Sequence, residues 1–185
     1  MTRDRDLMAA TVVFESMYGS TAAIAQAIAA GLAEVRVMAT VCEVGVAPAH
    51  APDERVGLLV VGAPTHQRGL STPRTREAAR ADGDPTLSPG AGVREWLDSL
   101  AYRVDDQAVA VFDTALHGRL AGSAANALAR RLTKAGARLV VPPESFVVTG
   151  RSTGLLPDEL ERARSWGRGL ALFAGTGAVR GPYPS

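Results

Sequence analysis

The sequence predicts a single α/β domain built around a doubly wound, five-stranded parallel sheet. Two apolar runs, Val12–Phe14 and Val56–Gly62, have the composition of strands buried on both faces. Each run is followed by a polar loop and then by a helical pattern, and this alternation recurs along the chain. The 185 residues are enough for one such domain with a substantial core. We therefore divide the chain into a lead (1–10), one domain (11–175) and a tail (176–185).

The first strand, from Thr11 to Phe14, leads through a short loop into a helix that runs to Leu32. Ile24, Ile28 and Leu32 repeat every four residues and so lie on one helical face. Small alanines between them allow the helix to pack close to a sheet. Ser20 or Thr21 is expected to cap this helix, because a hydroxyl there can accept a free backbone N–H.

The loop before this helix has the chemistry of a site for one phosphate group. Helix N-termini favour anions, and Ser16, Ser20 and Thr21 add hydroxyl donors around Gly19. There is no Lys or Arg between Ser16 and Thr21, and the G-x-x-x-x-G-K-[ST] pattern of triphosphate sites is absent. A phosphate monoester is therefore favoured over a triphosphate. An ordinary strand-to-helix turn with a capping serine is the alternative that the stretch alone leaves open.

The stretch Glu15-Ser16-Met17-Tyr18-Gly19-Ser20-Thr21 resembles the phosphate loop of flavodoxin-like proteins, which holds the phosphate of FMN. The resemblance implies FMN as cofactor and the strand order 2-1-3-4-5, in which the first strand pairs with the second and the third. The ligand crevice then opens at the carboxyl ends of strands one and three. The cofactor-binding residues implied in this loop, called the phosphate loop below, are Ser16, Met17, Tyr18, Gly19, Ser20 and Thr21.

Two further loops occupy the positions where this family holds the flavin ring. Val61–Thr65 is similar to the second flavin loop, and Phe112-Asp113-Thr114 lies where the third would approach the ring. Neither loop contains the Trp or Tyr that stacks on the ring in typical flavodoxins. The implied cofactor-binding residues are Pro64, Thr65, His66, Gln67, Arg68 and Gly69 in the second loop, and Asp113, Thr114, Ala115, Leu116 and His117 in the third.

The remaining elements follow from periodicity and from helix-end signals. Alternation from Val35 to Val41 predicts a strand at a sheet edge, and Ala108–Phe112 predicts the fourth strand. Trp96 lies on the apolar face of a predicted helix and is assigned to the core. Helices are expected at 74–80 after the cap Thr72, at 93–100, from Ser123 to Ala135, and at 158–174; the expected helix after the second strand is short or degenerate at 46–53. The fifth strand is expected at 137–141, broken by Pro142-Pro143 and resumed at 146–148.

Two other chemistries fit the sequence poorly. Gly150–Gly154 matches G-x-S-x-G, but a hydrolase would need a histidine after this serine and none follows His117. A phosphoryl-accepting receiver would need an aspartate ending the third strand, which instead ends in Gly62-Ala63-Pro64. His66 and His117 have no cysteine or carboxylate pair with which to form a metal site, so no metal is expected.

Composition restricts the partners and the compartment. A formal net charge of +1 predicts no binding to nucleic acid or to anionic membranes. The single cysteine, Cys42, excludes an internal disulfide and is expected to be a buried thiol near a strand end. No long apolar segment follows the N-terminus, so we expect a cytoplasmic protein without a membrane span.

Two functions remain open. The first is an FMN-binding redox protein that transfers electrons, either as a carrier for a redox partner protein or as an FMN-dependent oxidoreductase resembling quinone reductases, with a quinone-like acceptor. The second is a flavodoxin-fold module without flavin that serves in interaction or regulation. The sequence does not decide whether the protein is an enzyme, and it leaves the oligomeric state open, a homodimer included.

Overall fold

The structure is a computed structural model that describes residues 8–47, 56–66, 69–81, 88, 90–100, 104–117, 122–150 and 154–174. Two of the expected cofactor-binding residues, Gln67 and Arg68, lie outside this described part. The same holds for the tail at 176–185 and for most of the segment 46–53, where a short or degenerate helix is expected.

The sheet is parallel, and its strand order confirms the flavodoxin-like arrangement. The order is β2 (Met38–Glu43), β1 (Ala9–Phe14), β3 (Val56–Pro64), β4 (Ala108–Leu116) and β5 (Arg138–Leu139). In register, Val12 of β1 lies between Val41 of β2 and Val60 of β3. A further strand, β6 (Glu144–Val148), also pairs in parallel with β4. The fifth strand is thus split at Pro142-Pro143, as expected, because proline has no N–H to donate to the ladder.

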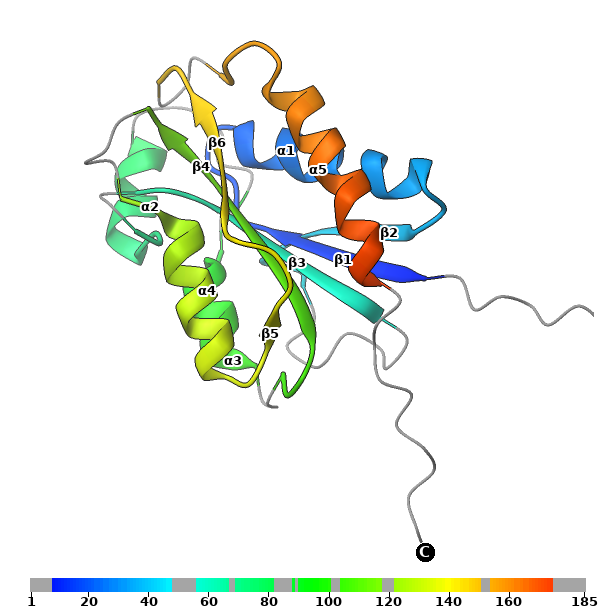
Figure 1. Cartoon of the computed structure of the whole chain (residues 1–185). Coiled ribbons are helices and arrows are strands. Elements are labelled where there is room, and N and C mark those ends of the chain that lie inside the picture. The colour runs from blue at the N-terminus through cyan, green and yellow to red at the C-terminus, as the bar shows by residue number, and fades with distance from the viewer. Residues whose placement is uncertain are drawn as a thin grey trace, which may run out of the picture.

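Helices cover both faces of the sheet (Figure 1). On one face α1 (Ser20–Glu34) packs beside α5 (Glu159–Ala174), and on the other lie α3 (Val93–Ser99) and α4 (Ala124–Lys134). The remaining helix, α2 (Pro73–Ala81), lies beside the carboxyl ends of the strands. Both sheet faces are therefore buried, which explains the uninterrupted apolar runs.

Alternate residues of the central strands supply two separate cores. Val12 and Val60 face the core beneath α1 and α5, whereas Val13 and Val61 face the core beneath α3 and α4. Trp96 packs in the second core and is 6% exposed, which confirms its assignment. In the first core three aromatic rings meet edge to face with centroids 6.1 to 6.4 Å apart, namely Phe112, Phe146 and Trp166.

The ends of α1 differ from the sequence prediction. The N-cap is Gly19, in a left-handed conformation with φ of 92°, and neither Ser20 nor Thr21 caps the helix. At the other end Val35 and Arg36 close the helix, and Arg36 takes a φ of 65°. The alternation that predicted a strand from Val35 therefore begins inside this turn, and β2 starts only at Met38. Exposed positions along β2 agree with its place at the sheet edge.

No helix in the described ranges is both long enough and apolar enough to cross a membrane.

Candidate functional site

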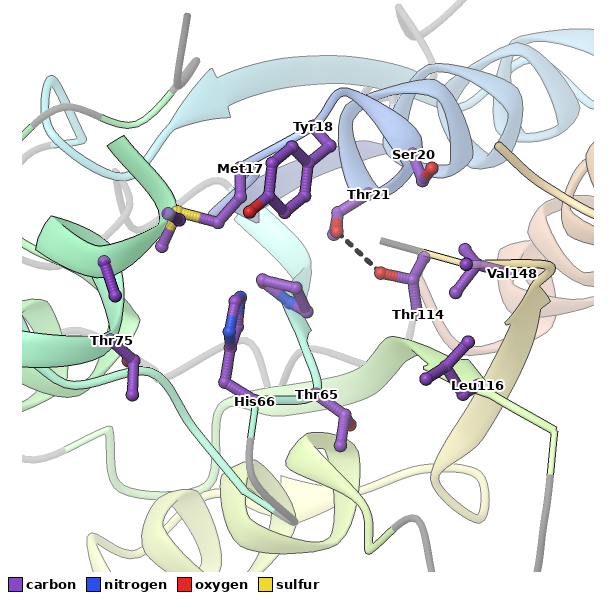
Figure 2. Close-up of a pocket in the computed structure, with 14 residues that line it drawn as sticks. Met17, Tyr18, Ser20, Thr21, Thr65, His66, Thr75, Thr114, Leu116 and Val148 are labelled. Carbon is purple, nitrogen blue, oxygen red and sulfur yellow. Dashed lines mark hydrogen bonds between the residues drawn. The ribbon is translucent and has the colours of Figure 1, made fainter. Parts of the chain in front are cut away.

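A cavity of about 300 Å³ lies at the carboxyl ends of β1, β3 and β4. In open α/β sheets this is the point where strand order reverses and where ligands bind. The volume is at the lower end of the range for small-molecule sites. Figure 2 shows the lining side chains, which come from five segments of the chain. They are Met17, Tyr18, Ser20, Thr21, Pro64, Thr65, His66, Thr75, Ala78, Ala79, Thr114, Leu116, Val148 and Gly150.

The phosphate loop turns sharply into the first turn of α1. Gly19 supplies the left-handed residue that this turn requires, a conformation that costs a residue with a side chain more than it costs glycine. The Ser16 hydroxyl accepts the backbone N–H of Gly19 at 3.2 Å and of Ala22 at 3.3 Å, and Ser16 is fully buried. Ser16 is therefore not among the cavity-lining side chains. Its hydroxyl stabilises the turn of the loop and accepts an N–H of the first helical turn.

The cavity side of the loop carries Met17, Tyr18, Ser20 and Thr21. The first turn of α1 holds no acidic residue that would oppose an anion. Among the contacts that the structure describes, the Ser20 hydroxyl has no hydrogen-bond partner, so it is available to a ligand. Figure 2 shows the Thr21 hydroxyl bonded to that of Thr114, at 2.8 Å. This bond ties the phosphate loop to the third loop.

The second loop is held in place by a buried carboxylate. Thr65 donates its hydroxyl to Asp113 Oδ2 at 2.9 Å and accepts the N–H of Ala124 at 2.8 Å. The same Asp113 oxygen accepts the Ser123 hydroxyl at 2.8 Å and the Ala125 N–H at 2.9 Å. Asp113 is fully buried and does not line the cavity, and its Oδ1 has no hydrogen-bond partner among the described residues. Its carboxylate therefore faces the start of α4 and positions Thr65.

The outer part of the second loop folds back on itself. His66 and Gly69 exchange backbone hydrogen bonds of 2.8 and 2.9 Å across the intervening pair of residues. This turn directs the His66 side chain to the cavity, which it reaches from a different loop than Tyr18 (Figure 2). Pro64 and Thr65 complete this wall, whereas Gly69 does not line the cavity.

The third loop contributes fewer cavity contacts than expected. Thr114 and Leu116 line the cavity, while Ala115 is buried elsewhere and His117 is exposed beyond the end of β4. The structure thus brings His66 to the cavity but not His117, and the part of the chain that it describes holds no group of side chains suited to a metal ion.

Five lining residues were not expected from the sequence. Three of them, Thr75, Ala78 and Ala79, lie on α2. Val148 is the last residue of β6, and Gly150 lies just after it. The helical pattern after Thr72-Pro73 predicted α2 itself, but small residues give no signal of the side on which a ligand lies. Among the lining residues that the structure describes, His66 alone can carry a charge near neutral pH. The described lining is therefore largely apolar and has no carboxylate, with hydroxyls concentrated where α1 begins.

Comparison with known proteins identifies the fold. No protein-family model matches the sequence, and no curated protein matches it either. Among solved structures, a flavodoxin from the domain Archaea is 18% identical with a TM-score of 0.67, over 90% of this chain and 99% of that one. Flavodoxin 2 from Bacillus cereus is 18% identical with a TM-score of 0.62, over 89% and 98% of the two chains.

Part of a larger protein has a similar fold. Rubredoxin oxygen:oxidoreductase from Desulfovibrio gigas is 16% identical with a TM-score of 0.64, over 91% of this chain and 36% of that one. At these identities the similarity concerns the fold, which is the flavodoxin-like fold.

Proposed function

We propose that this protein binds FMN in the cavity and acts in electron transfer. The observation that carries the proposal is the hydroxyl-bearing N-terminus of α1, which opens into the cavity at the carboxyl ends of β1, β3 and β4. The similarity in fold to flavodoxins points to the same ligand. When bound, the flavin would supply the redox chemistry by taking up and releasing one or two electrons.

The donor set fits a phosphate monoester. Ser20 and Thr21 would hold the phosphate through their hydroxyls and the free N–H groups of the first turn of α1. No lysine or arginine is needed, because the helix dipole and charge-assisted hydrogen bonds stabilise the anion. The ring would lie against the second and third loops, with Tyr18 and His66 as the lining residues that have flat side chains.

The chemistry of the lining also favours a neutral acceptor. None of the described residues that line the cavity is a carboxylate, lysine or arginine, so no described side chain there would recognise a charged substrate. We therefore propose a quinone-like small molecule as the acceptor, and a cytoplasmic FMN-dependent oxidoreductase as the form that the activity takes. A redox partner protein is the alternative acceptor. The flavin-free module is the competing function, and the absence of Trp and Tyr from the second and third loops favours it.

Calorimetry on flavin-free protein tests the proposal. FMN is titrated in parallel with riboflavin and with FAD, and the purified protein is inspected for flavin absorbance. We expect FMN to bind much more tightly than riboflavin, because only FMN carries the phosphate. Equal affinity for FMN and riboflavin would refute the claim that this loop binds the phosphate. If none of the three ligands binds, the flavin-free module is favoured.

A further inference from the structure

A buried chain of hydrogen bonds lies behind the phosphate loop. Glu15, the residue between β1 and Ser16, is fully buried. Its Oε1 accepts the hydroxyl of Ser71, and its Oε2 accepts the N–H of Val93 at 2.9 Å. Both carboxylate oxygens are therefore used by groups outside the phosphate loop.

The chain continues into α2 and α3. The Ser71 hydroxyl, which donates to Glu15, also accepts from Arg76 Nη1 at 2.8 Å. Arg76 Nη2 lies 3.1 Å from Glu95 Oε2, and Arg76 is 4% exposed. We call the chain Glu15–Ser71–Arg76–Glu95 the Glu15 network. Each of its two carboxylates contacts a donor, Ser71 for Glu15 and Arg76 for Glu95.

The third helix holds the same segment from a second side. Arg94 donates to the carbonyl oxygens of Leu70 and Ser71, each at 3.3 Å. The start of the helix is held in turn by the Glu95 carboxylate, which accepts the N–H of Gly92 at 2.8 Å. Leu70 and Ser71, which lead into α2, are thus held in place by side chains of α3.

The network packs tightly against Gly92, the residue before α3. A Cβ added at Gly92 would lie 2.4 Å from Arg76 Nη1 and 2.7 Å from Glu15 Oε2. Both distances are shorter than any ordinary contact, and the groups that would be displaced are the charged atoms themselves. Glycine at position 92 therefore lets Arg76 and Glu15 approach the start of α3, and a larger residue there would displace them.

The network lies beside the proposed site. Arg76 and Thr75 are neighbours on α2, and Arg76 joins the buried network while Thr75 lines the cavity together with Ala78 and Ala79. Glu15 immediately precedes Ser16 in the chain, and the Ser16 hydroxyl holds the turn of the phosphate loop. The network therefore connects the α2 wall of the cavity to the loop expected to hold the phosphate.

Stability alone does not account for such an arrangement. Taking charged groups out of water costs free energy that their mutual attraction does not always recover, and apolar replacements are often neutral or stabilising. What a fully bonded buried network does supply is one defined geometry.

We propose that Glu15 and Arg76 are positioning residues for ligand binding, which set the distance between the α2 wall and the phosphate loop. The inference rests on the proposed function. A ligand that spans the cavity from phosphate to ring depends on that distance, whereas inorganic phosphate contacts only the loop. Disturbing the network is therefore expected to weaken FMN binding and to leave phosphate binding unchanged.

The test titrates flavin-free Arg76→Met with FMN and, separately, with inorganic phosphate. Arg74 on the same helix is exposed, so Arg74→Met is the matched control. We expect Arg76→Met to lose about tenfold in FMN affinity, because α2 would no longer be preorganised for the ligand. Phosphate affinity should change less than twofold. Arg74→Met should bind both as the wild type does.

Glu95→Gln covers the case in which Arg76→Met does not fold, because the Glu95 side chain is 33% exposed and tolerates the change. It should weaken FMN binding in the same direction by a smaller factor. Unchanged FMN affinity in the folded variants would overturn the positioning role, as would equal losses for FMN and phosphate. A wild type that binds phosphate but not FMN would instead refute the proposed function.

Discussion

The hydroxyl of Thr21 lies 2.8 Å from the hydroxyl of Thr114, and this bond joins two segments that are 93 residues apart in the sequence. Both side chains are almost fully buried, at 2% and 5% exposure, yet both line the cavity. In such a pair one hydroxyl donates and the other accepts. If Thr114 donates, the hydrogen of Thr21 is free for a phosphate oxygen. The geometry thus allows Thr114 to set the direction in which Thr21 donates.

Replacing Thr21 by valine, which keeps its shape, is expected to weaken FMN binding by about 1.5–3 kcal/mol, the contribution of a hydrogen bond to a charged group. Thr114→Val should cost about 1 kcal/mol or less, because it affects the phosphate only through Thr21. Calorimetry on the two variants and on the double variant measures their coupling. Strictly additive losses would show that Thr114 does not orient Thr21.

The two serines of the phosphate loop are expected to separate binding from stability. Ser20→Ala should lose about 1.5–3 kcal/mol of FMN affinity with little effect on unfolding, since the structure describes no protein partner for its hydroxyl. Ser16→Ala should cost about 1 kcal/mol in the free energy of unfolding, because its hydroxyl accepts the N–H groups of Gly19 and Ala22. Urea unfolding and FMN titration of both variants decide this. The reverse pattern would place Ser16, and not Ser20, on the phosphate.

The sequence was sufficient for the central strands and for the loops at the carboxyl edge of the sheet, because buried strands and helix starts are local patterns. The strand order was implied by the resemblance of the phosphate loop to that of flavodoxin-like proteins, and the structure confirms it. The sequence was not sufficient for the direction of side chains within those loops. Ser16 and Asp113 were both expected to contact the cofactor, but their partners are the backbone of α1 and the start of α4. Those partners are set by how the elements pack together.

Long-range polar partners are the second limit. Ser71 is bonded to Glu15 from 56 residues away, and no periodicity marks either residue. At Val35–Arg36 a local pattern was present but misleading. Apolar and polar residues alternate there as they would in a strand, but the two residues form the end of α1. The α2 wall was missed for a related reason, because alanine and threonine on a short helix are equally suited to solvent and to a ligand.

The Glu15 carboxyl gives the protein a distinctive pH dependence. Burial raises its pKa above the ordinary value of 4.5, and the hydrogen bonds from Ser71 and Val93 and the charge of Arg76 only partly oppose this, while Glu95 adds to it. The folded state therefore holds this proton at pH values where the unfolded state has lost it. Its stabilising effect is complete below the unfolded pKa and is lost as pH rises through the folded pKa.

Wild type and Glu15→Gln are compared by urea unfolding from pH 4.5 to pH 8, with Glu77→Gln on the exposed side of α2 as control. Wild type should lose stability relative to Glu15→Gln as pH rises, by at most about 1.4 kcal/mol per pH unit for one proton. Glu77→Gln should run parallel to wild type. A constant difference between wild type and Glu15→Gln across this range would show that Glu15 keeps an ordinary pKa.

The electrostatics of the cavity set the expected reduction potential. Reduction to the anionic hydroquinone adds negative charge to the flavin, so nearby carboxylates make the potential more negative. The described cavity-lining residues include no carboxylate, and the Asp113 carboxylate is bonded at the start of α4 instead. We expect a less negative hydroquinone couple than in typical flavodoxins, which suits a quinone-like acceptor. Arg68, outside the described residues, is expected to act in the same direction, and Arg68→Ala tests it.

A carboxylate introduced into the cavity wall tests the argument directly. Leu116 lines the cavity and is 51% exposed, so it tolerates a polar residue. Leu116→Asp should make the hydroquinone couple more negative than Leu116→Asn, which has the same shape without the charge. One charge at about 6 Å with an effective dielectric near 20 contributes about 3 kcal/mol before screening, and solvent exposure lowers this considerably. Potentiometry on the two FMN-loaded variants measures the difference, and equal potentials would mean that position 116 is too far from the ring or too well solvated to influence it.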